Sequence, residues 1–258
     1  MAEPNTAPLK VVQLEAAPAN GAQAHTALVQ EVCQVLAAAG DPERAAGQRR
    51  YMKSSMPFHG ITSPQFKAIL RPILADPAYR ISSRGEWEAT VRALWDGATH
   101  RENRYAAIAL TGHRLYRPWQ DRDALPLYEH LIRTGAWWDL VDEVASNRVG
   151  PILRREPDTV APVIRRWGVA DDLWLRRSAV ICQLGSKAET DQALLEYCLV
   201  ANLEGSRFGS EFWIRKAVGW ALRQHARTDP EWVRALVTEH RDRLSPLSRR
   251  EALKHLAP

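Results

Sequence analysis

Residues 26–40 read TALVQEVCQVLAAAG, and the spacing of their apolar side chains recurs along most of the chain. The apolar side chains recur at intervals of three and four residues, which places them on one face of an α-helix. They are Leu28, Val32, Val35 and Leu36, and Gly40 ends the segment. The stretch therefore predicts an amphipathic helix that buries one face.

The same pattern recurs along the rest of the chain. We expect helices over residues 26–39 and 41–51, from Ser63 onward, and at 85–96, 101–116, 123–134, 136–154, 157–167, 171–184, 188–202, 210–227, 230–240 and 247–256. Breaks fall at Gly97, Gly135, Gly168, Gly185, Gly205 and Pro246. No alternating run of Val, Ile and Thr indicates a strand, so the sequence predicts an all-α fold.

The spacing of these helices favours a repeat architecture. A spacing of two helices for every ~35–40 residues is typical of HEAT-like repeats. Such repeats stack into a helical-repeat solenoid, and the predicted one has a concave basic face. A compact helical bundle is the alternative, although about twelve helices are many for one bundle.

Composition narrows the class of protein. The 258 residues are 45% hydrophobic and 25% charged, which is typical of a globular protein. The Ala- and Pro-rich residues 1–22 predict a disordered tail, and residues 23–258 predict one domain. A net charge of +5 permits a polyanionic partner such as DNA. Without a secretory signal or a long apolar run, we expect a cytoplasmic protein with no membrane partner.

Cysteine and histidine spacing gives no metal motif. The three cysteines contain no CxxC pair, and the eight histidines form neither HxxxH nor HExxH. We therefore expect no disulfide framework, no metal and no cofactor.

The segment AWWDLVDEV (136–144) carries the most informative constellation. On a helix, Trp137 falls with the aliphatic residues on a core face, whereas Trp138 and Asp142 stack four residues apart on another face. Three interpretations stay open at this point. The pair is a partly solvated carboxylate beside an indole, or an anionic aromatic-walled site for a cation, or part of a metal site with Asp139 and Glu143.

Three further segments combine aromatic and basic residues. Arg177 lies three residues after Trp174, so the two share a helix face. In FWIRKAVGWALRQHA (212–226), one face carries Trp213, Lys216, Trp220 and Arg223. Gly219 within that helix predicts close packing of another helix or of a ligand. The segment YMKSSMPFHGI (51–61) is a helix end followed by a loop.

The motifs YMKSSMPFHGI, LWDGATHRENRYAAIAL, WWDLVDEV, WLRRSAVICQL, FWIRKAVGWALRQHA and PLSRREALKHL occur in this order between residues 51 and 256. As an ordered set, over about residues 25–257, they resemble the DNA alkylation repair family of AlkD-like DNA glycosylases with HEAT-like repeats. The chain departs from the family pattern in its N-terminal tail and in added residues near 205–209.

The resemblance implies a set of site residues. It places the family's aromatic cleft on Trp138 and Trp220, its catalytic carboxylate on Asp142, its DNA-facing arginine on Arg177, and the tyrosine of its N-terminal motif on Tyr51.

The basic residues of the same motifs, Lys53, Lys216 and Arg223, join Arg177 and Tyr51 as the predicted DNA-binding set.

The resemblance also implies an activity. Such a monomer would bind double-stranded DNA that contains alkylated purines and hydrolyse the glycosidic bond of cationic N3- or N7-alkylpurines without base flipping. Bulky adducts would then be tolerated. The alternative is a non-catalytic helical-repeat scaffold that binds DNA or a protein partner. A carboxylate at Asp142, in the centre of the groove, favours the enzyme, since a surface for phosphates alone should avoid one.

Overall fold

The structure is a computed structural model that describes residues 21–256, so nearly all of the tail predicted over residues 1–22 lies outside the described residues. In residues 21–256 every regular element is helical and no strand occurs, which confirms the all-α prediction. The α-helices are α1 (Thr26–Ala38), α2 (Pro42–Met52), α3 (Ser63–Ala75), α4 (Arg84–Asp96), α5 (Arg101–Thr111), α6 (Leu125–Gly135), α7 (Trp138–Val144), α8 (Gly150–Arg155), α9 (Pro157–Gly168), α10 (Leu173–Ile181), α11 (Gln192–Val200), α12 (Phe212–His225), α13 (Pro230–Glu239) and α14 (Pro246–Ala252).

The helices begin where short polar side chains can accept the free N–H groups of a first turn. The Thr62 side chain accepts the N–H of Gln65 before α3, and the Asp41 side chain accepts the N–H of Arg44 before α2. Before α10, the Asp172 carboxylate accepts the N–H groups of Trp174 and Leu175 at 2.9 Å each. These local signals are why the sequence predicts most helix starts correctly.

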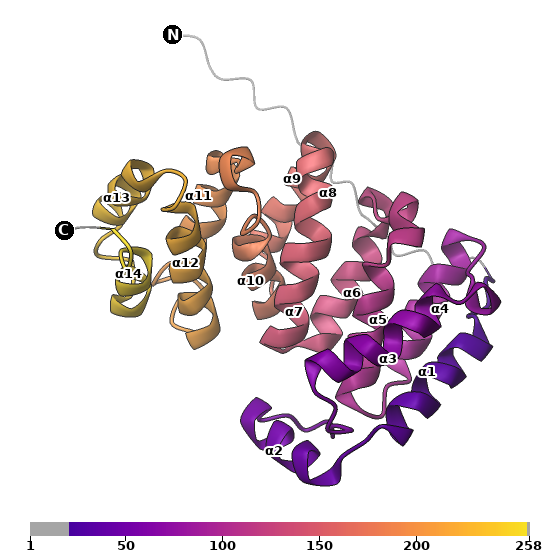
Figure 1. Cartoon of the computed structure of the whole chain (residues 1–258). Helices are drawn as coiled ribbons and strands as arrows, with labels where there is room; N and C mark the ends of the chain where they lie inside the picture. Colours follow the sequence, from indigo (N-terminus) through magenta and orange to yellow (C-terminus); the bar gives the residue numbers. More distant parts are fainter. Residues whose placement is uncertain (1–20, 257–258) are drawn as a thin grey trace.

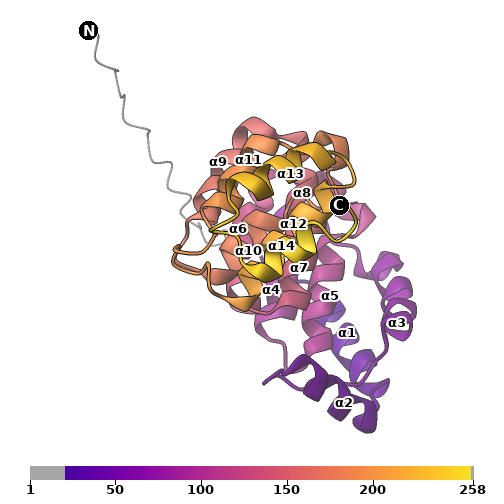
Figure 2. The same cartoon turned by 90° about the vertical axis from the view of Figure 1, so that its left-hand side faces the viewer.

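The helices form two layers that follow chain order. Helices α5, α7, α10 and α12 contact one another in succession, and α4, α6, α9, α11 and α13 pack against this row. Figure 1 shows the array running from α1–α4 at one end to α13 and α14 at the other. Figure 2 shows α2 projecting beyond α1, α3 and α5. This arrangement is a helical-repeat solenoid, as predicted.

One continuous apolar core joins the layers, and glycines allow its closest contacts. Trp87 and Trp95 are both 0% exposed within it. A Cβ added at Gly219 of α12 would lie 2.7 Å from Cβ of Glu251 on α14. The sequence predicted a close neighbour for Gly219, and that neighbour is helix α14.

The single helix predicted over residues 136–154 is wrong in its middle. The chain forms α7, then a π-helical turn over Ala145–Val149, then α8. Pro151 has no N–H to continue the regular α-helical hydrogen bonds, and a Cβ on Gly150 would lie 2.2 Å from the Cys182 carbonyl oxygen. The turn therefore brings the backbone at Gly150 against the end of α10.

The loop at 205–209, where the resemblance predicts added residues, folds back onto the segment that precedes α10. Gly205 adopts the left-handed conformation with φ of +88°, which glycine accepts without strain. Arg207 forms an ion pair with Asp171, and the Arg176 guanidinium lies 5.3 Å from the centre of the Phe208 ring. The loop is thus anchored beside α10 by charge and by an aromatic contact.

Candidate active site

A bidentate ion pair between α7 and α10 is central to the candidate site. Arg177 donates from Nε to Oδ1 of Asp142 at 2.7 Å and from Nη2 to Oδ2 at 2.6 Å. The side chains of Arg177 and Asp142 are only 4% and 13% exposed. The pair therefore fixes the Asp142 carboxylate in one orientation at the junction of two repeats.

Helix α12 completes the binding of Arg177. Its Nη1 donates to the backbone carbonyl of Trp213 at 2.6 Å, and its guanidinium lies 5.7 Å from the centre of the Trp213 ring. Trp213 also contacts Trp137 and Trp174, with ring centres 5.4 and 5.9 Å away. We call Trp137, Trp174 and Trp213 the tryptophan cluster, and it joins the N-terminal ends of α7, α10 and α12.

Burial and the ion pair act in opposite directions on Asp142. Removal from water raises the pKa of the Asp142 carboxyl, and the nearby Asp139 carboxylate raises it further. The hydrogen bonds and positive charge of Arg177 lower that pKa. Arg177 is therefore the group that favours the ionised form of Asp142.

Asp139, one turn earlier on α7, has a different arginine partner. Arg101 of α5 donates from Nε to Oδ2 of Asp139 at 3.2 Å and forms a second hydrogen bond from Nη2 to Oδ1. The Tyr105 hydroxyl donates to the same carboxylate at 2.5 Å. Burial raises the pKa of this hydroxyl, and the negative charge of Asp139 raises it further. Two neighbouring inter-helix junctions are thus joined by buried Arg–Asp pairs.

The third carboxylate of the segment also has its own partner. Arg148 of the π-helical turn lies 3.1 Å from Glu143, and it also donates to Thr111 at 3.0 Å. Asp139, Asp142 and Glu143 are therefore each bound by a separate arginine, and their carboxylates do not converge on a common point for a metal ion.

Lys216 and Arg223 of α12 face α14. Lys216 Nζ lies 3.9 Å from one carboxylate oxygen of Glu251, and Arg223 pairs with the other oxygen. The Lys216 side chain remains 40% exposed and that of Arg223 26% exposed. One acidic residue thus offsets part of the positive charge that the sequence placed on this face.

Tyr51 and Lys53 lie at the end of α2. Tyr51 is 78% exposed, and Lys53 adopts the left-handed conformation with φ of 48° that ends the helix. Tyr51 lines a cavity of about 700 Å³ between α2, α3, α5 and α7, together with Asp139 and Glu143. The fold therefore brings Tyr51 to a cavity that α7, the helix of Asp142, also lines.

Comparisons with known proteins agree with this arrangement. A family model described as DNA alkylation repair enzyme matches residues 32–256. The chain belongs to this family. A solved structure described as a predicted DNA alkylation repair enzyme from Enterococcus faecalis is 32% identical, with a TM-score of 0.73. The match covers 84% of this chain and 97% of that one. No curated protein matches the chain.

Membership of the DNA alkylation repair family supports a role in DNA repair and a DNA substrate. In the described part of the chain, no helix is both long enough and apolar enough to cross a membrane.

The predicted aromatic residues lie on two different helices of this DNA repair fold. Trp138 is the first residue of α7, and Trp220 lies on α12 and packs against the core. Both are half-buried. Among residues 21–256 no ring contact joins them, and the ring contacts near Asp142 come from the tryptophan cluster instead. Trp137, expected in the core, is half-buried in that cluster.

Arg177 differs from the solvated helix face that the sequence left open. Its guanidinium is buried because Asp142 and the Trp213 carbonyl bind it from two sides. Three of its five N–H groups are used in these bonds, so two remain for another acceptor. Its role in DNA binding stays a prediction.

Sequence reasoning missed the residues that hold the site from other helices. Glu102, 1% exposed, accepts the backbone N–H groups of His59, Gly60 and Ile61 and so fixes the loop after α2. Glu251 was missed because its partners lie 28 and 35 residues away. Both residues lie inside motifs of the sequence, Glu102 in LWDGATHRENRYAAIAL and Glu251 in PLSRREALKHL, but neither motif indicates which groups the carboxylates bind.

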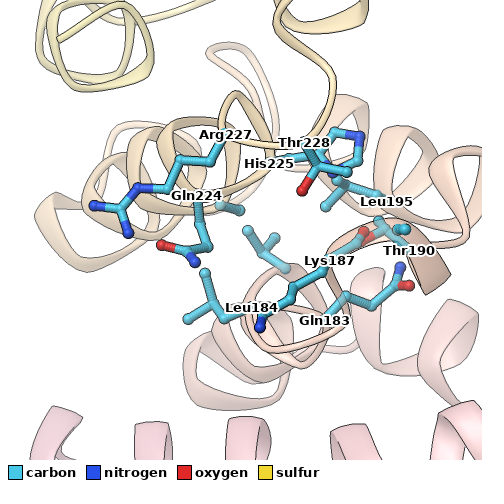
Figure 3. Close-up of a pocket in the computed structure, with 12 residues that line it drawn as sticks. Gln183, Leu184, Lys187, Thr190, Leu195, Gln224, His225, Arg227 and Thr228 are labelled. Atoms are coloured by element: carbon cyan, nitrogen blue, oxygen red, sulfur yellow. The ribbon is translucent and has the colours of Figure 1, made fainter. Parts of the chain in front are cut away.

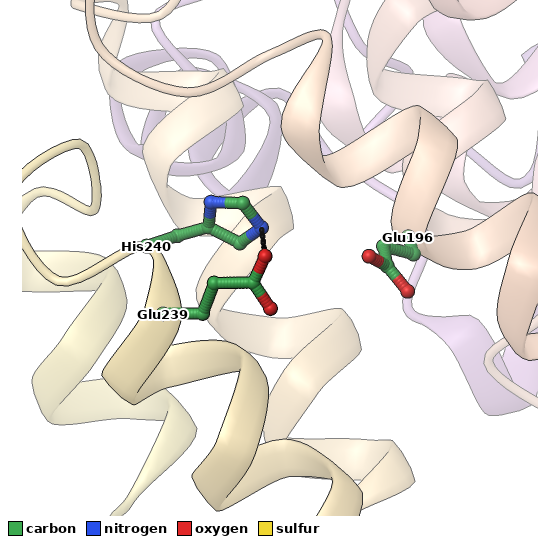
Figure 4. A group of neighbouring side chains, drawn as sticks. All are labelled: Glu196, Glu239 and His240. Carbon is green, nitrogen blue, oxygen red and sulfur yellow. Dashed lines mark ion pairs between the residues drawn. The ribbon is translucent and has the colours of Figure 1, made fainter.

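A separate group of potential metal ligands lies away from Asp142. The side chains of Glu196, Glu239 and His240 offer ligand atoms within 4.8 Å of one another (Figure 4). Glu239 is 69% exposed, and His240 lies 3.9 Å from it. Glutamates grouped with one histidine in this way are common on surfaces that bind no metal, and we assign no site here.

Proposed function

We propose that the protein is a monofunctional DNA glycosylase that hydrolyses the N-glycosidic bond of cationic N3- or N7-alkylpurines in duplex DNA. The observation that carries the proposal is the buried Asp142 carboxylate, held by Arg177 and 13% exposed at the junction of α7 and α10. An oriented carboxylate in a low-dielectric setting is suited to stabilising a developing positive charge.

Hydrolysis of this glycosidic bond requires little from the protein beyond the negative charge of Asp142. A cationic alkylpurine leaves as a neutral base when the electron pair of the C1′–N bond moves to the base. Positive charge then develops on the deoxyribose, and a water oxygen adds to C1′ and loses a proton. No acid is needed for the leaving group, so one carboxylate near the sugar is sufficient.

The size of the effect follows from Coulomb's law. Unit charges about 4 Å apart interact by about 4 kcal/mol at an effective dielectric constant of about 20. That energy corresponds to a factor of about 10³ in rate. Because Arg177 lies 2.6 Å from the same carboxylate, its positive charge offsets part of this stabilisation, and the factor is an upper value.

Arg177 has a double role in this proposal. It favours the ionised form of Asp142, and in this proposal one of its two remaining N–H groups would donate to a DNA phosphate that approaches the junction of α7 and α10. The indoles of Trp138 and Trp220 supply aromatic faces for the cationic nucleotide. That the lesion stays in the helix rests on the family resemblance, and we adopt it as part of the proposal.

The decisive experiment measures release of 7-methylguanine from methylated duplex DNA under single-turnover conditions. Asp142→Asn should slow excision by about 10²–10³ while duplex binding is retained. Asp139→Asn is the matched control, because it removes a carboxylate of similar burial from the same helix, 11% exposed and also paired with an arginine.

The outcomes separate the two functions considered. If wild-type protein binds the duplex and releases no base, the chain is a scaffold. If Asp142→Asn is as active as wild type, or no slower than Asp139→Asn, the role of Asp142 is wrong. A second pair of duplexes, with a methyl and a bulky cationic adduct at the same purine nitrogen, tests the absence of flipping. Complete refusal of the bulky adduct would indicate a closed pocket.

A further inference from the structure

A second cavity lies between the ends of α10 and α12, and the proposed glycosylase chemistry does not use it. Its volume is about 410 Å³, within the range of small-molecule sites. Figure 3 shows Gln224, His225, Arg227 and Thr228 around it from the end of α12, and Lys187 from the segment after α10. The tryptophan cluster and Asp142 do not line it.

One wall of this cavity carries a buried hydrogen-bond donor. His225 is 6% exposed, and its Nε2 lies 3.0 Å from the Gln192 amide nitrogen, which also donates to Asp229 at 2.9 Å. An amide nitrogen only donates, so Nε2 of the neutral imidazole accepts and the proton lies on Nδ1. Burial lowers the pKa of His225, which favours this neutral form.

The Nδ1–H of His225 has no acceptor within residues 21–256. Buried donors without an acceptor are uncommon because the desolvation of the N–H group is not compensated. The Trp232 ring packs against the His225 ring at nearly a right angle, with the two ring centres 5.1 Å apart. A water molecule or a ligand in the cavity can therefore accept a hydrogen bond from this donor.

The other residues that line the cavity indicate what kind of ligand would fit it. Lys187 and Arg227 are exposed, and neither has an ion-pair partner in the described part of the chain. None of the lining residues is acidic, and Thr190 and Thr228 add hydroxyl groups. The apolar part of the wall comes from Val180, Leu184, Leu195 and Ala221. Positive charge at the mouth and an apolar wall together fit an anionic group on an apolar body.

We propose that this cavity is a binding site for a phosphate monoester with an aromatic or apolar body, bound through Lys187, Arg227 and the Nδ1–H of His225. The lining thus offers an ammonium, a guanidinium and an imidazole N–H, and three donor groups suit the three terminal oxygens of a phosphate monoester better than the two of a carboxylate. The same group occurs on free nucleoside monophosphates and at the 5′ ends of DNA strands.

The site is tested by isothermal titration calorimetry of the full-length protein at low salt. The experiment measures the affinity for deoxyadenosine 5′-monophosphate, which is the probe. Deoxyadenosine, which lacks the phosphate, is the ligand control. Lys187→Ala and Arg227→Ala should each weaken binding of the nucleotide about tenfold, because each removes one charged contact. Arg241→Ala, an exposed arginine that does not line the cavity, is the matched protein control and should leave the affinity unchanged.

A 5′-phosphorylated and a 5′-hydroxyl duplex without a lesion distinguish the two sources of phosphate. Preference for the phosphorylated duplex that is lost in Lys187→Ala supports a DNA end as the ligand, and nucleotide binding supports a free one. The proposal is overturned if deoxyadenosine binds as well as its monophosphate, or if neither phosphate compound binds. It is also overturned if Lys187→Ala behaves like Arg241→Ala. These binding measurements do not depend on excision of alkylated bases. The result for the cavity can therefore be told apart from the result for the proposed glycosylase activity.

Discussion

Removal of Arg177 is the perturbation whose outcome the structure predicts most directly. Arg177→Met keeps much of the side-chain volume and deletes a guanidinium that is 4% exposed and makes two bonds to Asp142. Loss of one partner from a buried pair costs about 3–5 kcal/mol, because the remaining charge is left without compensation. We expect a loss of this size in the free energy of unfolding at pH 7.

The penalty should also depend on pH. Burial already holds the pKa of Asp142 above its ordinary value, so the folded state binds more protons than the unfolded state between those two pKa values. Stability contributed by this group therefore falls as pH rises through that interval. Without Arg177 the folded pKa rises further and the interval widens, so Arg177→Met should cost more at pH 8 than at pH 5.

The assay is urea unfolding followed by circular dichroism, since the tryptophan cluster next to Arg177 would confuse a fluorescence signal. The double variant Asp142→Asn/Arg177→Met should be less destabilised than the sum of the two single variants, because it leaves no unpaired charge. A cost below about 1 kcal/mol for Arg177→Met at pH 8, the value of an exposed pair, would refute the burial argument.

Three further predictions concern the reaction and the fold. The protein should release cationic alkylpurines and leave uracil or hypoxanthine in place, because it supplies no acid to a neutral leaving group; efficient uracil release, measured on a uracil duplex, would contradict the mechanism. Trp138→Ala and Trp220→Ala should reduce single-turnover excision more than duplex affinity, and equal losses in both would place these indoles on the general DNA surface. Gly150→Ala should lower the free energy of unfolding by about 1–3 kcal/mol or more, since its Cβ would meet the Cys182 carbonyl oxygen at 2.2 Å; a thermal melt that matches wild type would show that the backbone can move away.

Much of the fold could be predicted because its signals are local. The apolar spacing of residues 26–39 and the cap at Asp41 depend only on neighbours along the chain, and the structure confirms the helices there. The middle of residues 136–154 could not be predicted in the same way. The π-helical turn depends on Gly150 packing against Cys182, a contact between residues 32 positions apart in the sequence.

The candidate site divides along the same line. The spacing of Trp138 and Asp142 by four residues places them on one helix face, and any helix would do so. That Arg177 binds Asp142, that Trp213 contributes a carbonyl, and that Glu251 faces Arg223 depend on which helices pack together. The helices, the basic balance and the residue types of the site follow from the amino-acid sequence. The charge partners depend on tertiary packing, because a pair between distant residues forms only where packing brings them within a few ångströms and removes the water between them.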